Sequence, residues 1–110
     1  MDLGIHGKTA MVTACSSGLG LSVARRLAME GCNLALFARS EDKLEQAAKE
    51  IRSQFNVQVV CVAGDMTKQR DVENYADVCR KNLGDPDILA LNTGRPPLKM
   101  TTVLGETDPQ

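Results

Sequence analysis

The sequence predicts an α/β fold in which a doubly wound parallel sheet carries helices on both faces. Along the 110-residue chain, segments typical of strands alternate with segments of helical periodicity. The run at 33–38 is apolar at almost every position, as a strand covered on both faces is. Strands separated by helices of this length connect through right-handed crossovers, so we expect them to pair in parallel.

The first strand and helix are expected at 8–13 and from Gly18 onward. The first run is rich in β-formers and ends in small residues, after which the period becomes helical. Gly31 is expected to end this helix as a C-terminal cap. The apolar face of the helix is expected to contain Leu19, Val23 and Leu27, with Ala24 and Ala28 beside them.

The second helix is predicted to follow the strand at 33–38. Ser40 can cap its first turn, and Glu41 and Asp42 suit the positive end of its dipole. A third strand is expected at 57–62. The inner stripe of the second helix is formed by Leu44, Ala47, Ala48 and Ile51.

The third helix is predicted between a cap at Thr67 and a stop at Gly84. A turn at Asp85-Pro86 then leads to a fourth strand at 87–91. The inner stripe of this helix is formed by Val72, Tyr75, Ala76 and Cys79.

Composition favours a single globular domain and gives no reason to expect nucleic acid or membrane as a partner. The chain is 43% hydrophobic and 25% charged, and its net charge is −1. The cysteine spacing suits no zinc motif, so we expect buried, reduced thiols in a cytoplasmic protein. These residues are Cys15, Cys32, Cys61 and Cys79. The single histidine, His6, is expected in a surface turn.

A loop of small residues joins the first strand to the first helix. Its backbone N–H groups can approach a phosphate closely, and the helix N-terminus favours an anion. A plain strand-to-helix turn is the alternative interpretation. The candidate binding residues are Thr13, Cys15, Ser16, Ser17, Gly18, Leu19 and Gly20.

This loop is similar to the Thr-Gly-x-x-x-Gly-x-Gly motif of the short-chain dehydrogenase/reductase family. The resemblance covers residues 7–94 and implies a Rossmann-type sheet with strand order 3-2-1-4. It implies the first two helices on one face and the third on the other. Ala14 occupies the first Gly position of the motif, where a positive φ would be strained.

The end of the second strand favours NADP(H) over NAD(H). An NAD site usually has a carboxylate here for the ribose 2′-hydroxyl. This chain has Arg39, whose guanidinium can bind a 2′-phosphate, and Ser40 can add a donor. A solvated arginine at a strand end is the alternative interpretation.

Two further elements match the family in order and spacing. The resemblance implies that Asp65 hydrogen-bonds the adenine ring and that Met66 packs near it; a turn aspartate is the alternative. The segment Asn92-Thr93-Gly94 resembles the family's Asn-Ala-Gly element beside the cofactor ribose. With the prolines that follow, it resembles the 3-oxoacyl-carrier-protein-reductase-like subgroup.

No position matches the family's catalytic Ser, Tyr or Lys, so no catalytic residue is assigned. The single tyrosine, Tyr75, lies on an apolar helix stripe and is expected in the core. We expect residues 1–94 to form an NADP-binding Rossmann half-domain. Residues 95–110 are expected to form a loop leading to a truncated helix that starts near Thr107-Asp108-Pro109.

Three functions remain open from the sequence. The first is a fragment of an NADP(H)-dependent oxidoreductase that transfers hydride between nicotinamide and a small carbonyl or alcohol and is a homo-oligomer at full length. The second is a stand-alone module that binds NADP(H) without turnover. The third is an interaction protein that completes its sheet with another chain, because the fourth strand would be an apolar edge.

Overall fold

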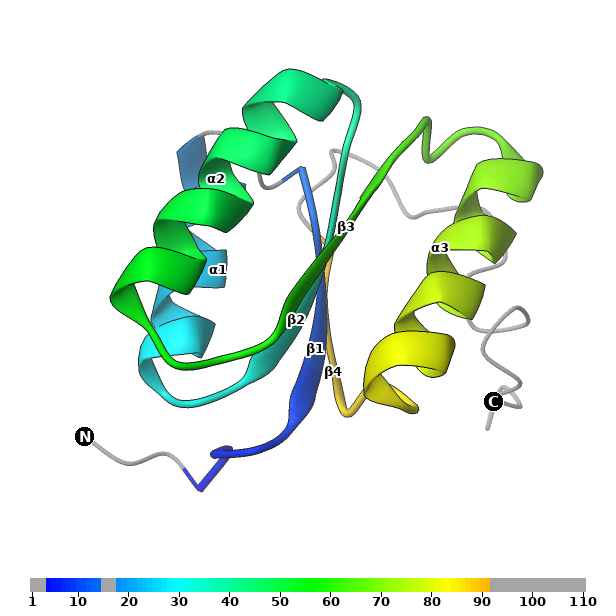
Figure 1. The fold of residues 1–110 in the computed structure, drawn as a ribbon. Helices are drawn as coiled ribbons and strands as arrows, with labels where there is room; N and C mark the ends of the chain where they lie inside the picture. The colour runs from blue at the N-terminus through cyan, green and yellow to red at the C-terminus, as the bar shows by residue number, and fades with distance from the viewer. Residues whose placement is uncertain (1–3, 15–17, 92–110) are drawn as a thin grey trace.

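The computed structural model describes residues 4–14 and 18–91. Within these ranges four parallel strands form one sheet in the order β3-β2-β1-β4, as predicted (Figure 1). The elements in chain order are β1 (Thr9–Thr13), α1 (Gly18–Met29), β2 (Asn33–Ala38), α2 (Glu41–Gln54), β3 (Val59–Ala63), α3 (Gln69–Leu83) and β4 (Ile88–Ala90).

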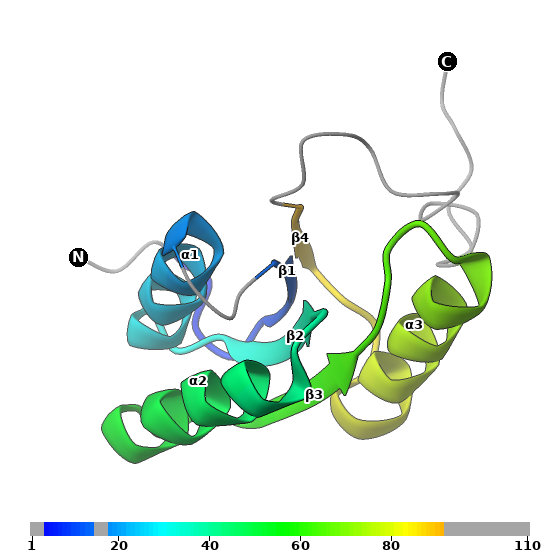
Figure 2. The same cartoon turned by 90° about the horizontal axis from the view of Figure 1, so that it is seen from above.

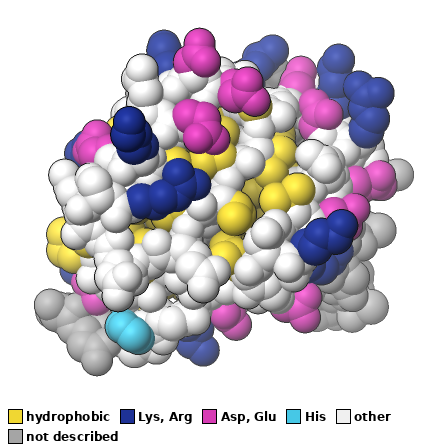
Figure 3. All heavy atoms as spheres, viewed as in Figure 1, with side chains coloured by type: hydrophobic (Ala, Val, Ile, Leu, Met, Phe, Trp, Pro, Cys, Tyr) yellow, Lys and Arg dark blue, Asp and Glu magenta, His cyan; other side chains and the backbone are white. Residues whose placement is uncertain are grey.

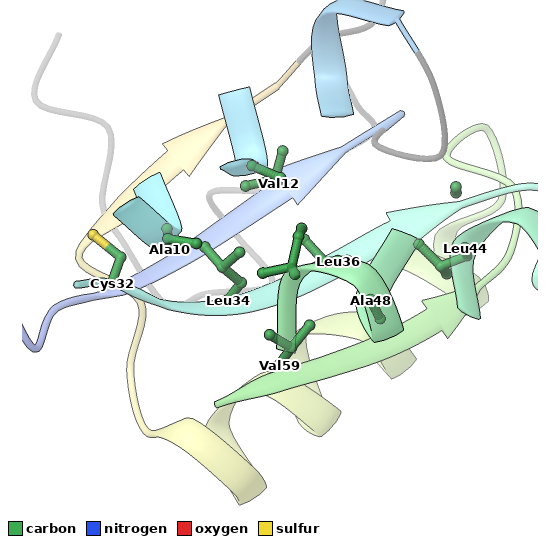
Figure 4. Close-up of a cluster of buried hydrophobic side chains, with 12 residues drawn as sticks. Ala10, Val12, Cys32, Leu34, Leu36, Leu44, Ala48 and Val59 are labelled. Carbon is green, nitrogen blue, oxygen red and sulfur yellow. The ribbon is translucent and has the colours of Figure 1, made fainter. Parts of the chain in front are cut away.

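The helices cover both faces of the sheet, which makes three layers. Figure 2 shows α1 and α2 on one side of the strands and α3 on the other, as expected. The apolar core is therefore double. The first cluster, seen in Figure 4, packs alternate residues of β1 and β2 against α1 and α2. The second cluster packs Met11, Ala35 and Phe37 against α3.

The expected apolar face of α1 is confirmed except at Leu19. Gly20, Ala24 and Ala28 are its buried residues, whereas the side chain of Leu19 is 73% exposed. Small residues spaced by four allow the helix backbone to lie close to the strands. Val23 and Leu27 are half-buried and pack at the margins of the contact between α1 and the sheet. The small residues lie at its centre.

The predicted glycine stop of α1 is confirmed. Gly31 has a φ of +90°, and its N–H donates to the carbonyl of Ala28 at 2.9 Å. The N–H of Cys32 reaches back to Leu27 at 3.0 Å, which completes a Schellman motif. A Cβ on Gly31 would also lie 2.3 Å from the ring of His6, an exposed residue in a turn as expected.

One predicted helix cap is confirmed and the other is wrong. Ser40 caps α2, because its Oγ accepts a hydrogen bond from the N–H of Lys43 at 3.4 Å. The N-cap of α3 is Lys68, which makes no side-chain cap, and not Thr67. The hydroxyl of Thr67 instead donates to Asp65. Gly84 ends α3 as predicted, with a φ of +91°.

Three strands begin later than expected, and side chains bond to the backbone at the starts of two of them. The Asp87 carboxylate accepts the N–H of Thr9 at 3.0 Å, and β4 begins only at Ile88. Similarly, Asn33 Oδ1 accepts the N–H of Gln58, and β3 begins at Val59. The pairing is thus extended by side chains beyond the regular ladder.

The outer edge of β3 is partly covered by α2. The guanidinium of Arg52 donates to the carbonyl of Val59 at 2.6 Å. Figure 3 shows hydrophobic side chains gathered in the middle of this face, where β3 lies between α2 and α3, with charged side chains around them.

None of the helices described is long and apolar enough to span a bilayer.

Candidate functional site

The sheet register brings the ends of the strands that precede the predicted binding segments to one edge of the sheet. Thr13 pairs with Phe37, and Ala38 pairs with Ala63. On the other side of β1, Val12 pairs with Ala90. The residues after these positions therefore leave the sheet together at its carboxyl edge, the upper edge in Figure 1. Ligands of open α/β sheets bind at this edge.

The turn from β1 to α1 has an unusual backbone at both of its described ends. Ala14 has a φ of +53°, and Gly18, where α1 begins, has a φ of +61°. Thr13 is fully buried beneath the turn. Ala14 therefore has the positive φ at which an alanine is expected to be strained. The predicted residues Cys15, Ser16 and Ser17 lie outside the described residues.

We expect the substitution Ala14→Gly to stabilise the protein by about 0.5 kcal/mol. Glycine removes a left-handed strain of about 1–2 kcal/mol but loses more chain entropy on folding. Ala63→Gly is the matched control, since Ala63 is exposed and has no positive φ; it should destabilise by roughly 0.5–1 kcal/mol. Urea denaturation measures both. Equal destabilisation by the two changes would contradict the strain at Ala14.

Arg39 projects from the end of β2 into solvent. Its side chain is 83% exposed, and its Nη2 lies 3.7 Å from Oδ2 of Asp65. The two sequence motifs, predicted separately, are therefore neighbours. Ser40 uses its oxygen to cap α2, and a hydroxyl that accepts one hydrogen bond can still donate another.

Asp65 is held by a network of hydrogen bonds in the loop between β3 and α3. Its Oδ1 accepts from the N–H of Thr67 at 2.9 Å and from the hydroxyl of Thr67 at 2.7 Å. Its own N–H donates to the carboxylate of Asp71 at 2.9 Å. The bonds from Thr67, helped by nearby Arg39, lower the pKa of Asp65.

Sequence reasoning missed the roles of Thr67 and Asp71. The Asp-x-Thr spacing is typical of an Asx turn and was an available signal for Thr67. The contact from Asp71 depends on how α3 approaches the sheet. Met66 is half-buried and packs against the second core cluster.

The last predicted element, Asn92, Thr93 and Gly94, lies outside the described residues. Tyr75 is fully buried, as expected, and its hydroxyl donates within the core to carbonyls of Val12 and Ala35. The tyrosine thus belongs to the interior of the domain and not to the carboxyl edge.

The described cysteines are free thiols. Cys32 and Cys79 are buried as expected, and burial raises the pKa of each. Cys61 is only half-buried, yet burial and Glu45 raise its pKa to about 11. These thiols stay protonated at neutral pH, so they are poor nucleophiles.

A groove of about 590 Å³ lies away from these segments, near the C-terminal ends of α1 and α2. Its lining includes His6, Met29, Glu30 and Phe55. None of the predicted binding residues that the structure describes lines it. The carboxyl edge remains the candidate site because the turn geometry and the exposed cation both occur there.

A family model for short chain dehydrogenases matches residues 8–109. The chain belongs to the short-chain dehydrogenase family. The match contains every described segment of the candidate site, and the observed strand order agrees with the order that the resemblance implied.

Two curated relatives illustrate the similarity. A glycine betaine reductase of Emericella nidulans is 42% identical over 90 residues, which cover 82% of this chain and 7% of the relative. The 11-beta-hydroxysteroid dehydrogenase-like 2 of Arabidopsis thaliana is 35% identical over 92 residues, which cover 84% of this chain and 30% of the relative.

Solved structures of short-chain dehydrogenases are also similar to this chain. L-sorbose reductase from Gluconobacter frateurii, complexed with NADPH and L-sorbose, has a TM-score of 0.82 at 40% identity, covering 86% of this chain and 36% of its own. An actinorhodin polyketide ketoreductase with NADPH has a TM-score of 0.75 at 32% identity, covering 87% and 36%. The presence of a ketoreductase agrees with the predicted resemblance to 3-oxoacyl-carrier-protein reductases. This chain spans about a third of the length of these two proteins.

Proposed function

We propose that this chain is the N-terminal cofactor-binding part of an NADP(H)-dependent short-chain oxidoreductase. Its reaction would be hydride transfer between nicotinamide and a carbonyl or alcohol. The observation that carries the proposal is the exposed guanidinium of Arg39 at the end of β2, where an NAD site places a carboxylate. The NADPH held by the sorbose reductase and the actinorhodin ketoreductase supports the choice of cofactor.

The described residues fit a dinucleotide phosphate at the start of α1. The first turn of α1 has no acidic residue, whereas α2 has Glu41 and Asp42 and α3 has Asp71. A helix N-terminus without a carboxylate leaves its N–H groups and dipole for another anion. The positive φ angles of Ala14 and Gly18 also suit a tight turn around a phosphate.

Each predicted binding residue has a role in this proposal. The turn from Thr13 to Gly20 binds the pyrophosphate, Arg39 and Ser40 bind the 2′-phosphate, and Asp65 with Met66 contacts the adenine. Asn92, Thr93 and Gly94 would lie beside the ribose. When bound, the nicotinamide supplies or accepts the hydride. Tyr75 takes no part in proton transfer, since its hydroxyl is bonded inside the core.

A fluorescence titration with NADPH tests the proposal, and Gly18→Val supplies its sharpest variant. No described atom lies within 4 Å of a Cβ on Gly18, so the effect arises from the backbone and not from a clash. A β-branched residue is strained at a φ of +61° and shifts the first turn of α1. We expect about tenfold weaker NADPH binding, or 1.4 kcal/mol.

Gly18→Ala is the matched control for this experiment. Alanine adopts a similar φ at Ala14, so this variant should bind NADPH within about threefold of the parent protein. Unchanged affinity in Gly18→Val would remove the phosphate assignment. Absence of NADPH binding in the parent protein would overturn the proposed function.

Two alternative functions can each be distinguished from the main proposal by experiment. A stand-alone NADP(H)-binding module would bind NADPH and show no reductase activity with carbonyl substrates. A protein that completes its sheet with another chain is favoured by β4, whose outer edge pairs with no strand among the residues described. Light scattering that finds a folded monomer excludes this second alternative. Under the main proposal, we expect the full-length protein to be cytoplasmic and to form homo-oligomers.

A further inference from the structure

The two carboxylate oxygens of Asp65 have different partners, Thr67 and Arg39. Both donors of Thr67, its N–H and its hydroxyl, bind Oδ1 at 2.9 and 2.7 Å. The other oxygen, Oδ2, is the one that lies near the guanidinium. The carboxylate is therefore held in one orientation, with its two oxygens in different roles.

The loop around Asp65 is fixed at its backbone as well. The N–H of Asp65 donates to Asp71 at 2.9 Å, and its carbonyl accepts from Lys68 at 3.0 Å. One residue earlier, the N–H of Gly64 donates to Ala38 at 3.0 Å, next to Arg39 itself. The carboxylate can thus change orientation only by losing the bonds from Thr67.

The contact between Arg39 and Asp65 is long, and its closest atoms are Nη2 and the single oxygen Oδ2. Its Nη2–Oδ2 distance is 3.7 Å, whereas a two-pronged arginine–carboxylate pair has distances of about 2.8 Å. A carboxylate released from Thr67 could turn both oxygens to Arg39 and occupy its donors. In the observed arrangement most of the five guanidinium N–H groups face solvent, since the side chain is 83% exposed.

We propose that Thr67 is a positioning residue for recognition of the adenosine 2′-phosphate. By holding Oδ1 of Asp65, it keeps that carboxylate from closing on Arg39 and leaves the guanidinium for the phosphate. This inference rests on the proposed function. The hydroxyl of Thr67 does not cap α3, because the N-cap of this helix is Lys68 and no side chain caps it.

The test compares two ligands that differ only by the 2′-phosphate, namely 2′,5′-ADP and ADP, by calorimetric titration. In Thr67→Val, which keeps the shape and removes the hydroxyl, affinity for 2′,5′-ADP should fall about fivefold. Affinity for ADP should change less than about twofold. Thr67→Ser restores the hydroxyl and should restore the affinity. Equal losses for both ligands, or no rescue by serine, would overturn the proposal.

A double-mutant cycle isolates the part that runs through Asp65. In an Asp65→Asn background, Arg39 has no carboxylate to close on, so Thr67→Val should no longer change the ratio of the two affinities. A ratio that still falls fivefold refutes the route through Asp65. If Thr67→Val does not fold, Thr67→Ala replaces it, with circular dichroism spectra compared with those of the parent protein.

A measurement without nucleotide separates this inference from the proposed function. Carboxyl NMR titration should show the pKa of Asp65 rising part of the way toward its usual value in Thr67→Val, because the backbone N–H of residue 67 still donates to the carboxylate. In Thr67→Ser, which keeps the hydroxyl, the pKa should stay low. Unchanged pKa in Thr67→Val refutes the positioning contact. If the parent protein binds neither nucleotide while this pKa shift is seen, the contact exists but the proposed function and its use in phosphate recognition both fail.

Discussion

Replacing Arg39 by aspartate is expected to lower NADPH affinity about 100-fold, or about 3 kcal/mol. The change removes charge-assisted hydrogen bonds to the 2′-phosphate and places a second carboxylate beside Asp65. NADH lacks this phosphate, so its affinity should change less than about threefold. Fluorescence titrations with both nucleotides at one ionic strength measure the difference.

Arg39→Gln is the control for this charge reversal. It removes the positive charge without adding a negative one, and it should lower NADPH affinity by roughly tenfold. Because Arg39 is exposed, added salt should reduce its contribution and bring the affinities of the variants and the parent closer. Equal effects of Arg39→Asp on NADPH and NADH would contradict the 2′-phosphate role.

Tyr75→Ala is expected to lower the free energy of unfolding by about 4 kcal/mol. The ring is fully buried on the inner face of α3, where its centroid lies 4.7 Å from that of Phe37. Its removal leaves a cavity and takes a donor from carbonyls of Val12 and Ala35. Such a loss is a large part of the stability of an ordinary domain.

Tyr75→Phe separates the hydroxyl from the ring. It keeps the packing with Phe37 and removes only the hydrogen bonds, so we expect a loss of about 1 kcal/mol. Urea denaturation of the parent protein, Tyr75→Ala and Tyr75→Phe measures the three free energies of unfolding. A negligible loss in Tyr75→Ala would show that the tyrosine is not a core residue, and would reopen the question of its role.

Most of the secondary structure could be predicted because local signals agreed with one another. β2 was predicted with both of its ends, since its run of apolar residues lies between a glycine stop and the cap of Ser40. The stripes of α2 and α3 were also predicted residue by residue. In both helices a polar face leaves a single apolar stripe, which fixes the side that packs on the sheet.

The errors occurred where local signals were ambiguous. In α1, leucines and small residues both recur with helical spacing, and only the close approach to the sheet selects Gly20, Ala24 and Ala28. Thr67 precedes a helix but bonds to an aspartate behind it. The proximity of Arg39 to Asp65 depends on the pairing of β2 with β3, and no local pattern contains that register.

The hydrogen bond from Arg52 to Val59 has a consequence for self-association. A foreign strand that approached β3 would have to displace this arginine before it gained a bond of its own. Edge strands defended by cations are a common protection against amyloid-like stacking. The outer edge of β3 is therefore protected at Val59 against pairing with a strand of another molecule.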